Sequence, residues 1–176
     1  FSVPNKDGKF WFVDGTNGLD GNSGKSPELA LKTIGRAHTL AGDNTGDTIV
    51  IFPGTYVEAV NITKDSLTLR PAFWGGNSKR VAIAAASGSI SLTIGDVWRT
   101  RVLGLRVAGT SALGVRCSGE SSFFDGCDFT SDTTHGFQFH PSTTTADYTG
   151  SGTTIMNSIF RECGGAGLRT ISDTDV

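Results

Sequence analysis

Three acidic side chains in the second half of the chain are the candidates for catalysis. Asp125 and Asp128 lie close together, and Glu162 follows in a related segment. A pair of carboxyl groups can serve as general acid and general base, the arrangement that glycoside hydrolysis requires. If these segments stack, the three carboxylates could converge on one face. The alternative is that Asp128 pairs with Arg106, both facing outward on neighbouring strands, and that the other two are solvated surface charges.

Aromatic side chains in predicted turns are candidates for binding sugars. Trp74 and Trp98 lie in turns, and Tyr148 lies in a polar loop that begins at Pro141. An exposed indole ring is a flat apolar platform against which a sugar ring can stack. Burial of the tryptophans beneath a neighbouring loop is the alternative. The polar loop could contact a partner subunit or a glycan, or could simply extend a turn.

A loop near the N-terminus contains candidate metal ligands. Asp14, Asn17, Asp20 and Asn22 offer the hard oxygen atoms that Ca²⁺ prefers. Their spacing differs from that of an EF-hand, whose terminal Glu is missing here. A turn rich in Asp, Asn and Gly explains the same residues. The sequence therefore predicts no cofactor by default, with calcium at this loop as the alternative.

The three cysteines, Cys117, Cys127 and Cys163, cannot all pair with one another, and their spacing matches no zinc-binding pattern. Cysteine is among the most often buried residue types and behaves there as a small apolar side chain. We therefore expect buried free thiols. One disulfide with one remaining reactive thiol is the alternative.

The charge and hydropathy of the chain exclude several classes of function. The 176 residues carry a formal net charge of -2, from 15 Lys and Arg against 17 Asp and Glu. This balance lacks the basic surface that binds a phosphate backbone, so we expect no nucleic-acid partner. No apolar stretch suits a transmembrane helix, and the N-terminus lacks both Met and the apolar core of a signal peptide. We expect a processed product or an excised fragment, with no membrane partner.

Residues 1–46 are expected to form an N-terminal cap. Phe10–Val13 is a short strand-like run, and it leads into a loop of residues that tolerate positive φ. Ser26 suits the N-cap of a helix and Pro27 its first position, while an apolar face continues to Ala41. Gly then ends the pattern. We expect one amphipathic helix here, whose apolar face covers the rest of the fold.

Residues 47–176 are predicted to form stacked coils of short strands. The segment Val102–Val107 aligns with Phe124–Phe129 and then with Ile155–Phe160, at offsets of 22 and 31 residues. The segment Gly114–Cys117 recurs at the same two offsets. Because both segments recur at the same offsets, they belong to one repeating coil. The longer offset indicates an insertion in one turn. We therefore predict an all-β solenoid, a parallel β-helix with an N-terminal capping helix.

Stacking of coils at a spacing of about 4.8 Å aligns equivalent residues in ladders. The inner ladders on this register are Val107, Phe129 and Phe160, and Val115, Phe137 and Leu168. An outer stripe consists of Arg116, Gln138 and Arg169, which join the candidates for carbohydrate binding. Around Ser89–Ile94 the pattern shifts by about one residue, so we do not extend the ladders further toward the N-terminus.

The beginning of the chain resembles a known family. The resemblance rests on Trp11–Gly18, Gly24–Pro27, Ala30–Ile34 and Asp47–Tyr56. These segments are similar to the N-terminal part of pectin-lyase-like right-handed β-helix proteins, among them bacteriophage tailspikes and related virion proteins. The resemblance implies that the N-terminal helix plugs the open end of the solenoid and that a Pro-Gly-x-Tyr turn closes the first coil. The Gly-His-Gly turn and paired aspartates of the family's hydrolases are missing, as is the Arg-x-Pro-x-x-Arg string of its lyases.

The resemblance, together with the absence of these catalytic motifs, implies a virion structural or adhesion protein. A phage tailspike or head fibre that recognises a surface glycan is an example. The resemblance also implies a homotrimer or contacts with other virion subunits, and a location on the virion surface or outside the cell. One alternative is the N-terminal part of a polysaccharide lyase or glycoside hydrolase with its active site in later coils. No C-terminal capping segment follows the last repeat, so we expect that the chain was cut, that another subunit covers its last coil, or that order stops there. Another alternative is a stalk protein of a bacterial surface.

Overall fold

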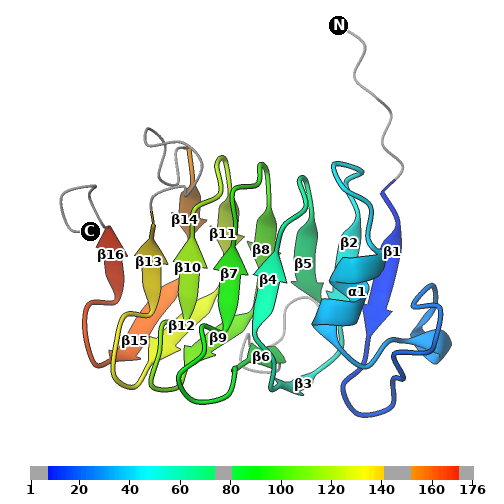
Figure 1. Ribbon diagram of the computed structural model, residues 1–176, viewed down its shortest axis with the longest axis horizontal. Coiled ribbons are helices and arrows are strands. Elements are labelled where there is room, and N and C mark those ends of the chain that lie inside the picture. Colours follow the sequence, from blue (N-terminus) through cyan, green and yellow to red (C-terminus); the bar gives the residue numbers. More distant parts are fainter. Residues whose placement is uncertain (1–7, 74–80, 141–151, 171–176) are drawn as a thin grey trace, which may run out of the picture.

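The structure is a computed structural model that describes residues 8–73, 81–140 and 152–170. Its strands form three parallel sheets along the molecule, and an α-helix lies at the N-terminal end (Figure 1). From β2 (Thr48–Ile51) onward each sheet takes every third strand, so the backbone winds through the three sheets in turn. The chain is thus a right-handed parallel β-helix. Among the described residues, no helix has the length and apolar character needed to cross a membrane.

The three sheets are named here by the order in which the chain enters them. Sheet A contains β1 (Phe10–Val13), β2 (Thr48–Ile51), β5 (Thr68–Pro71), β8 (Arg101–Leu103), β11 (Phe123–Asp125) and β14 (Thr154–Met156). Sheet B contains β3 (Gly54–Tyr56), β6 (Val81–Ile83), β9 (Arg106–Gly109), β12 (Asp128–Ser131) and β15 (Ile159–Cys163). Sheet C contains β4 (Val60–Ile62), β7 (Leu92–Ile94), β10 (Val115–Cys117), β13 (Phe137–Phe139) and β16 (Leu168–Thr170).

The pairing register confirms both inner ladders predicted from the repeats. In sheet B, Val107 pairs with Phe129 and Phe129 with Phe160. In sheet C, Val115 pairs with Phe137 and Phe137 with Leu168. The second ladder also continues toward the N-terminus, because Leu92 pairs with Val115. The shift in the sequence pattern before Leu92 therefore reflects turns of unequal length and not a break in the ladder.

The interior of the solenoid is filled by apolar side chains that alternate with outward residues along each strand. Phe124, Phe129 and Phe137 come from the three strands of one coil, and all three are fully buried. Their ring centroids lie 4.9–5.9 Å apart with steep interplanar angles. Edge-to-face contact of this kind is a favoured aromatic arrangement. One coil thus supplies an aromatic cluster to the core.

The corner between sheets A and B is two residues long in three consecutive coils. Its first residue is Gly104, Gly126 or Asn157, with φ of 60°, 64° and 48°. A β-carbon disfavours this left-handed conformation, which Gly and Asn tolerate better than other residues. These tight corners account for part of the high glycine content.

The expectation of one continuous helix over Ser26–Ala41 is wrong. A 3-10 helix, η1 (Pro27–Leu29), is followed by extended residues, and α1 (Ile34–Leu40) begins only after them. The break arises because the amide and carbonyl of Leu31 form hydrogen bonds of 2.9 and 2.8 Å with β1 and the residue after it. Backbone groups used in this bridge are not available to a helix.

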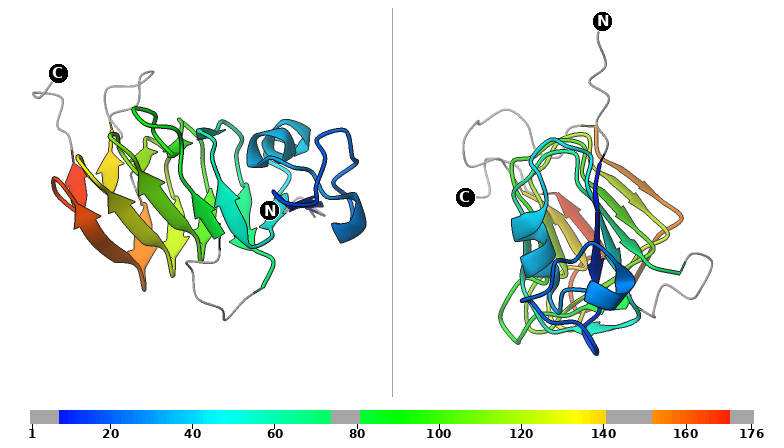
Figure 2. Two further views of the ribbon diagram at one scale, coloured as in Figure 1. Left: turned by 90° about the horizontal axis from the view of Figure 1, so that it is seen from below. Right: turned by 90° about the vertical axis from the view of Figure 1, so that its right-hand side faces the viewer.

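The shorter helix still covers the end of the solenoid, as the resemblance implies. Ile34 and Ala37 are fully buried and belong to the same apolar cluster as Ile49 and Ile51 of β2. Seen along the coil axis, α1 and β1 lie across the N-terminal end of the coils (Figure 2). This end of the apolar interior is therefore covered.

The Pro-Gly-x-Tyr segment has a different position from the one that the resemblance implies. Pro53 lies in the corner between β2 and β3, and Gly54–Tyr56 is β3 itself, so the segment lies within the first coil and does not close it. Tyr56 is buried, and its hydroxyl oxygen lies 2.8 Å from the carbonyl oxygen of Phe52 and 3.2 Å from the amide nitrogen of Gly15. Burial raises the pKa of Tyr56 to about 12. The neutral hydroxyl ties the loop after β1 to the first coil.

Candidate carbohydrate-binding face

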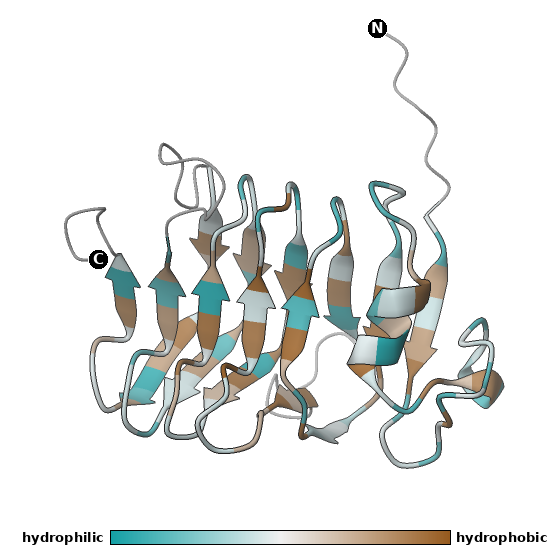
Figure 3. Ribbon diagram, viewed as in Figure 1, coloured by the Kyte–Doolittle hydropathy of each residue, from teal (hydrophilic) through white to brown (hydrophobic). Residues whose placement is uncertain are grey.

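The outward face of sheet C presents a row of polar side chains, one from each coil. Strand pairing aligns the row in the order Asn61, Thr93, Arg116, Gln138 and Arg169. The residues on either side of Asn61, Thr93 and Arg116 are buried in the core, so the row lies on the opposite face of the sheet. Five coils at about 4.8 Å give a length of roughly 19 Å. We call this row the sheet C stripe, and its polar bands alternate with apolar ones along the front strands of Figure 3.

The sheet C stripe carries two cations and no carboxylate. Gln138 is 6% exposed, with Arg116 beside it on one coil and Arg169 on the next. The buried Nε of Arg116 has no hydrogen-bond partner in the part of the chain that the structure describes. Nη1 of Arg169 lies 3.0 Å from Nε2 of His135. The structure thus brings together the three stripe residues that the sequence predicted.

The chemistry of the sheet C stripe suits binding and not catalysis. A guanidinium group binds a carboxylate or sulfate through paired, charge-assisted hydrogen bonds. Gln138 is buried between the two arginines, whereas the exposed amide of Asn61 can both donate and accept, as sugar hydroxyls require. None of the five side chains is an acid or base that titrates near neutral pH.

The acidic candidates Asp128 and Glu162 are both bound by one arginine. Asp128 is 2% exposed, and its two carboxylate oxygens accept hydrogen bonds from Arg161 at 2.8 and 2.5 Å. Glu162 accepts from the same guanidinium at 3.0 Å and lies 3.9 Å from Nη2 of Arg106. The expected pairing of Asp128 with Arg106 is therefore wrong. Arg161 projects from the following strand, and its planar fork meets both oxygens of Asp128.

Asp125 has a separate partner. It ends β11, and its carboxylate accepts a hydrogen bond of 2.8 Å from Nδ2 of Asn157 on the next coil. All three acidic candidates thus take part in contacts between coils. These contacts account for Asp125, Asp128 and Glu162 as structural links, and a catalytic role for them stays a prediction.

The candidate calcium ligands make hydrogen bonds within the cap. Asp14 accepts from the amide of Asn17 at 3.0 Å, and such bonds lower its pKa although burial acts to raise it. Asp20 accepts from the amide and the hydroxyl of Thr33, each at 2.9 Å, and Asn22 donates to a backbone carbonyl. Within residues 8–73, 81–140 and 152–170, no three acidic, His or Cys side chains are placed to hold a metal ion. Calcium binding stays a prediction.

Trp98 is the one aromatic candidate that the described residues include. It lies in the turn from sheet C to sheet A, and it is 56% exposed. Its carbonyl accepts from Ser66 at 2.7 Å, and its backbone pairs with Glu120 on the next coil. The indole is thus accessible on a turn held at both sides. Trp74 and Tyr148 lie outside the described residues.

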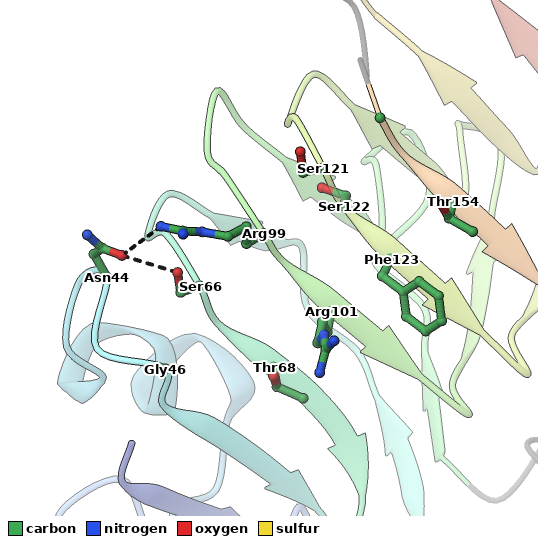
Figure 4. Close-up of a pocket in the computed structure, with 11 residues that line it drawn as sticks. Asn44, Gly46, Ser66, Thr68, Arg99, Arg101, Ser121, Ser122, Phe123 and Thr154 are labelled. Atoms are coloured by element: carbon green, nitrogen blue, oxygen red, sulfur yellow. Dashed lines mark hydrogen bonds between the residues drawn. The ribbon is translucent and has the colours of Figure 1, made fainter. Parts of the chain in front are cut away.

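A groove that sequence analysis missed lies along the edge of sheet A (Figure 4). Its volume is about 690 Å³. The lining comes mainly from the first residues of four strands and from the residues two positions before them: Thr68, Arg101, Phe123 and Thr154, with Ser66, Arg99, Ser121 and Gly152. In the sequence, the only indication of this groove is the pair Arg99 and Arg101. Two nearby cations are too common to predict a groove.

The three-sheet solenoid defines the class of the chain as a parallel β-helix of the pectin-lyase-like fold. The chain is similar to the pectin methylesterase from Aspergillus niger in deglycosylated form, with a TM-score of 0.54 and 18% identity over 78% of this chain and 50% of that one. It is also similar to pectin methylesterase PemA from Erwinia chrysanthemi, with a TM-score of 0.52 and 18% identity over 77% and 48% of the two chains.

A further similar structure is a pectin methylesterase in complex with hexasaccharide VII, with a TM-score of 0.50 and 18% identity over 77% of this chain and 49% of that one. The chain spans about half the length of these three structures. No protein-family model and no curated protein sequence matches it. Identity at this level establishes the shared fold and leaves function to the chemistry of the site.

Proposed function

We propose that this protein binds an acidic polysaccharide along the sheet C stripe. The observation that carries the proposal is the in-register row of Arg116, Gln138 and Arg169, with Thr93 and Asn61 continuing it. A linear polymer laid along the solenoid axis meets one polar side chain about every 4.8 Å. The two guanidinium groups match acidic groups on the polymer, and the amide of Asn61 and the hydroxyl of Thr93 match its hydroxyl groups.

The comparisons support a glycan as the partner. One of the similar structures is a pectin methylesterase that holds a hexasaccharide. A β-helix of the same fold therefore provides a surface on which an oligosaccharide can lie. The sheet C stripe gives this chain its own means of holding such a ligand.

We further propose that the protein acts as a virion adhesion protein, in the manner of a phage tailspike or head fibre, on the virion surface or outside the cell. A homotrimer or contact with other virion subunits belongs to this proposal. Its support is the sequence resemblance at the N-terminal cap. Light scattering coupled to size-exclusion chromatography tests it, since a trimer is expected and a monomer would contradict that assembly.

The second candidate function is catalytic: the chain would be part of a polysaccharide lyase or glycoside hydrolase. The fold that it shares with pectin methylesterases favours this candidate. Incubation with a panel of acidic polysaccharides tests it by the ultraviolet absorbance of unsaturated uronates and by new reducing ends. Product release would support this candidate. Absence of both products across the panel would remove lyase and glycoside hydrolase activity for this chain.

Binding to the sheet C stripe is tested by Arg116→Thr with Arg169→Thr. Thr93 occupies the same position of the row, so threonine is compatible with the strand. We expect affinity for polygalacturonate, measured by isothermal titration calorimetry, to fall about tenfold or more, because two charge-assisted contacts are lost. The charge-matched control is Lys25→Thr with Lys32→Thr, both exposed in the cap. Equal affinity of the stripe variant and this control would overturn the proposal.

A further inference from the structure

We propose that the groove along sheet A is a second binding site, for an anionic saccharide that bears carboxylate or sulfate groups. This site uses residues of sheet A and of the turn that leads into it, and none of the sheet C stripe. In Figure 4, Arg99 and Arg101 lie between Thr68 of the preceding coil and Phe123 of the following coil. The proposal is independent of binding at sheet C.

The groove has the dimensions of a site for an elongated small ligand. Strand pairing aligns Thr68, Arg101, Phe123 and Thr154 in one row along the axis. A second row, two residues earlier in each coil, consists of Ser66, Arg99, Ser121 and Gly152. Four coils span roughly 14 Å at the usual strand spacing. The volume of about 690 Å³ falls within the range of roughly 300–1,000 Å³ that is common for small-molecule sites.

The charge of the groove selects an anion. Arg99 and Arg101 are exposed, and the other lining residues are neutral: Asn44, Gly46, Ser66, Thr68, Ser121, Ser122, Phe123, Gly152 and Thr154. The whole chain has a net charge of -2, so this local excess of positive charge is not a consequence of composition. Guanidinium groups in such a setting match carboxylate or sulfate, and the hydroxyls around them match a sugar.

Two acidic residues of the turns that lead into sheet A are directed to the backbone. Asp43 accepts from the amide of Asp65 at 2.8 Å, and Asp65 accepts from the amide of Trp98 at 2.9 Å. Glu120 is half-buried beside Ser121 and does not line the groove. The carboxylates of Asp43 and Asp65 therefore form a chain of contacts along the axis.

Both arginines are already positioned by contacts within the protein. Nη2 of Arg99 lies 3.3 Å from Oδ1 of Asn44, two coils away in the stack (Figure 4). The guanidinium carbon of Arg101 lies 5.9 Å from the ring centroid of Phe123, within the range of a cation–π contact. Holding these side chains before binding reduces the entropy lost when a ligand arrives. The ring of Phe123, which is partly exposed, also offers an apolar surface to a sugar.

The backbone of the groove carries an energetic cost that function can explain. Ser66, Arg99 and Ser121 have φ of 59°, 60° and 51°, whereas Gly46 and Gly152 occupy the same turn position at the two ends of the row. A left-handed residue with a side chain is less stable there than glycine. Such residues persist where the surrounding structure fixes them, and they cluster at functional sites. Arg99 has this position at the centre of the groove.

The test uses a variant built from residues that neighbouring coils already contain. Arg99→Gly copies Gly46 and Gly152, and Arg101→Thr copies Thr68 and Thr154. The double variant should therefore fold, which its amide spectrum verifies. Nuclear magnetic resonance titrations with trigalacturonate, with a sulfated trisaccharide and with neutral maltotriose separate carboxylate, sulfate and uncharged ligands. The amides of Ser66 and Ser121 report the groove, and the amide of Gln138 reports the sheet C stripe.

We expect at least one anionic probe to shift the amides of Ser66 and Ser121, with affinity about tenfold lower in R99G/R101T, because two charge-assisted contacts are lost. The variant R116T/R169T should lose the Gln138 response and leave the Ser66 and Ser121 shifts in place. A wild type that shows the groove shifts but no Gln138 response would count against the sheet C proposal and not against this one. The groove proposal fails if neither anionic probe shifts these amides. It fails equally if maltotriose binds as well as the anions, or if R99G/R101T binds like the wild type.

Discussion

The side chain of Asp47 shows how much of the cap depends on a single residue. Its carboxylate is 1% exposed and accepts hydrogen bonds of 2.7–2.9 Å from Lys9, Trp11, Gly42 and Thr45. Burial acts to raise the pKa of Asp47, but these four donors outweigh it and hold the pKa below its ordinary value. The ionised carboxylate therefore joins β1, the end of the cap and the start of β2.

Asp47→Asn should lower the free energy of unfolding by about 2–3 kcal/mol, because the amide brings donors to a site already filled with donors. The folded-state pKa lies below the unfolded value of about 3.9, so the stabilisation is complete above about pH 5. It is lost as the pH falls through the folded-state pKa. Urea unfolding of wild type and variant across this range measures the effect.

The matched control for this substitution is Asp43→Asn, because Asp43 is exposed and accepts one backbone amide on the next coil. We expect a much smaller change in the urea midpoint for the control. A stability difference between wild type and Asp47→Asn that stays constant down to acidic pH would contradict the role of the ionised carboxylate.

The cysteines agree with the expectation of free thiols. All three are unpaired, with Cys117 and Cys127 buried and Cys163 partly exposed. Burial raises the pKa of the Cys117 and Cys127 thiols to about 11. The thiolate is the reactive form, so these two side chains serve as small apolar residues of the core.

At the scale of elements, the helix α1 is held by a residue from the coil that it covers. The carboxylate of Glu58 accepts from the amides of Ile34 and Gly35 at 2.8 and 2.9 Å. The side chain of Thr33 accepts from Arg36 at 3.1 Å. The first amides of a helix have no partners within it and favour negative charge. A seven-residue helix depends on such contacts because it is too short to be stable alone.

Glu58→Ala should destabilise the fold by about 1 kcal/mol, since two helix amides lose a charged acceptor. Glu58→Gln should cost less, because the amide oxygen can still accept. Amide hydrogen exchange provides the local measurement, and the amides of Ile34 and Gly35 should exchange faster in Glu58→Ala. Unchanged exchange at both positions would show that the contact does not hold the helix.

At the scale of the whole molecule, each inner ladder runs through several coils, and its equivalent residues are not equally buried. Phe129 and Phe160 are neighbours in one inner ladder, with ring centroids 5.2 Å apart. Phe129 is fully buried, whereas Phe160 in the last described coil is only partly buried. Each coil contacts mainly its neighbours, so the cost of a substitution should follow local burial.

Phe129→Ala should therefore cost about 3–5 kcal/mol, the usual cost of emptying a filled aromatic site. Phe160→Ala removes the same atoms from the same ladder and serves as the matched comparison. We expect it to cost less than half as much. Chemical denaturation of this chain compares the two variants, and equal losses would contradict a gradient of burial along the ladder.

The sequence by itself determined the coil, its two inner ladders and the sheet C stripe. Inward positions must be apolar at every turn, so Val107 and Phe129, or Val115 and Phe137, recur at a constant offset that can be seen without coordinates. Outward neighbours such as Arg116 follow from the same register because side chains alternate along a strand. The pattern fixes which residues share a row.

Only the tertiary structure decided which outward groups meet and what the turns enclose. The residues from Ser26 onward favour a helix, but Leu31 pairs with β1 and interrupts it. This contact joins two segments that are distant in the sequence, so local sequence does not reveal it. Asp128 pairs with Arg161 of the following strand and not with Arg106, its neighbour in register on the preceding strand. The groove around Arg99 depends on the conformation of successive turns. Such contacts arise from the stacking of coils, so they exist only once the chain has folded.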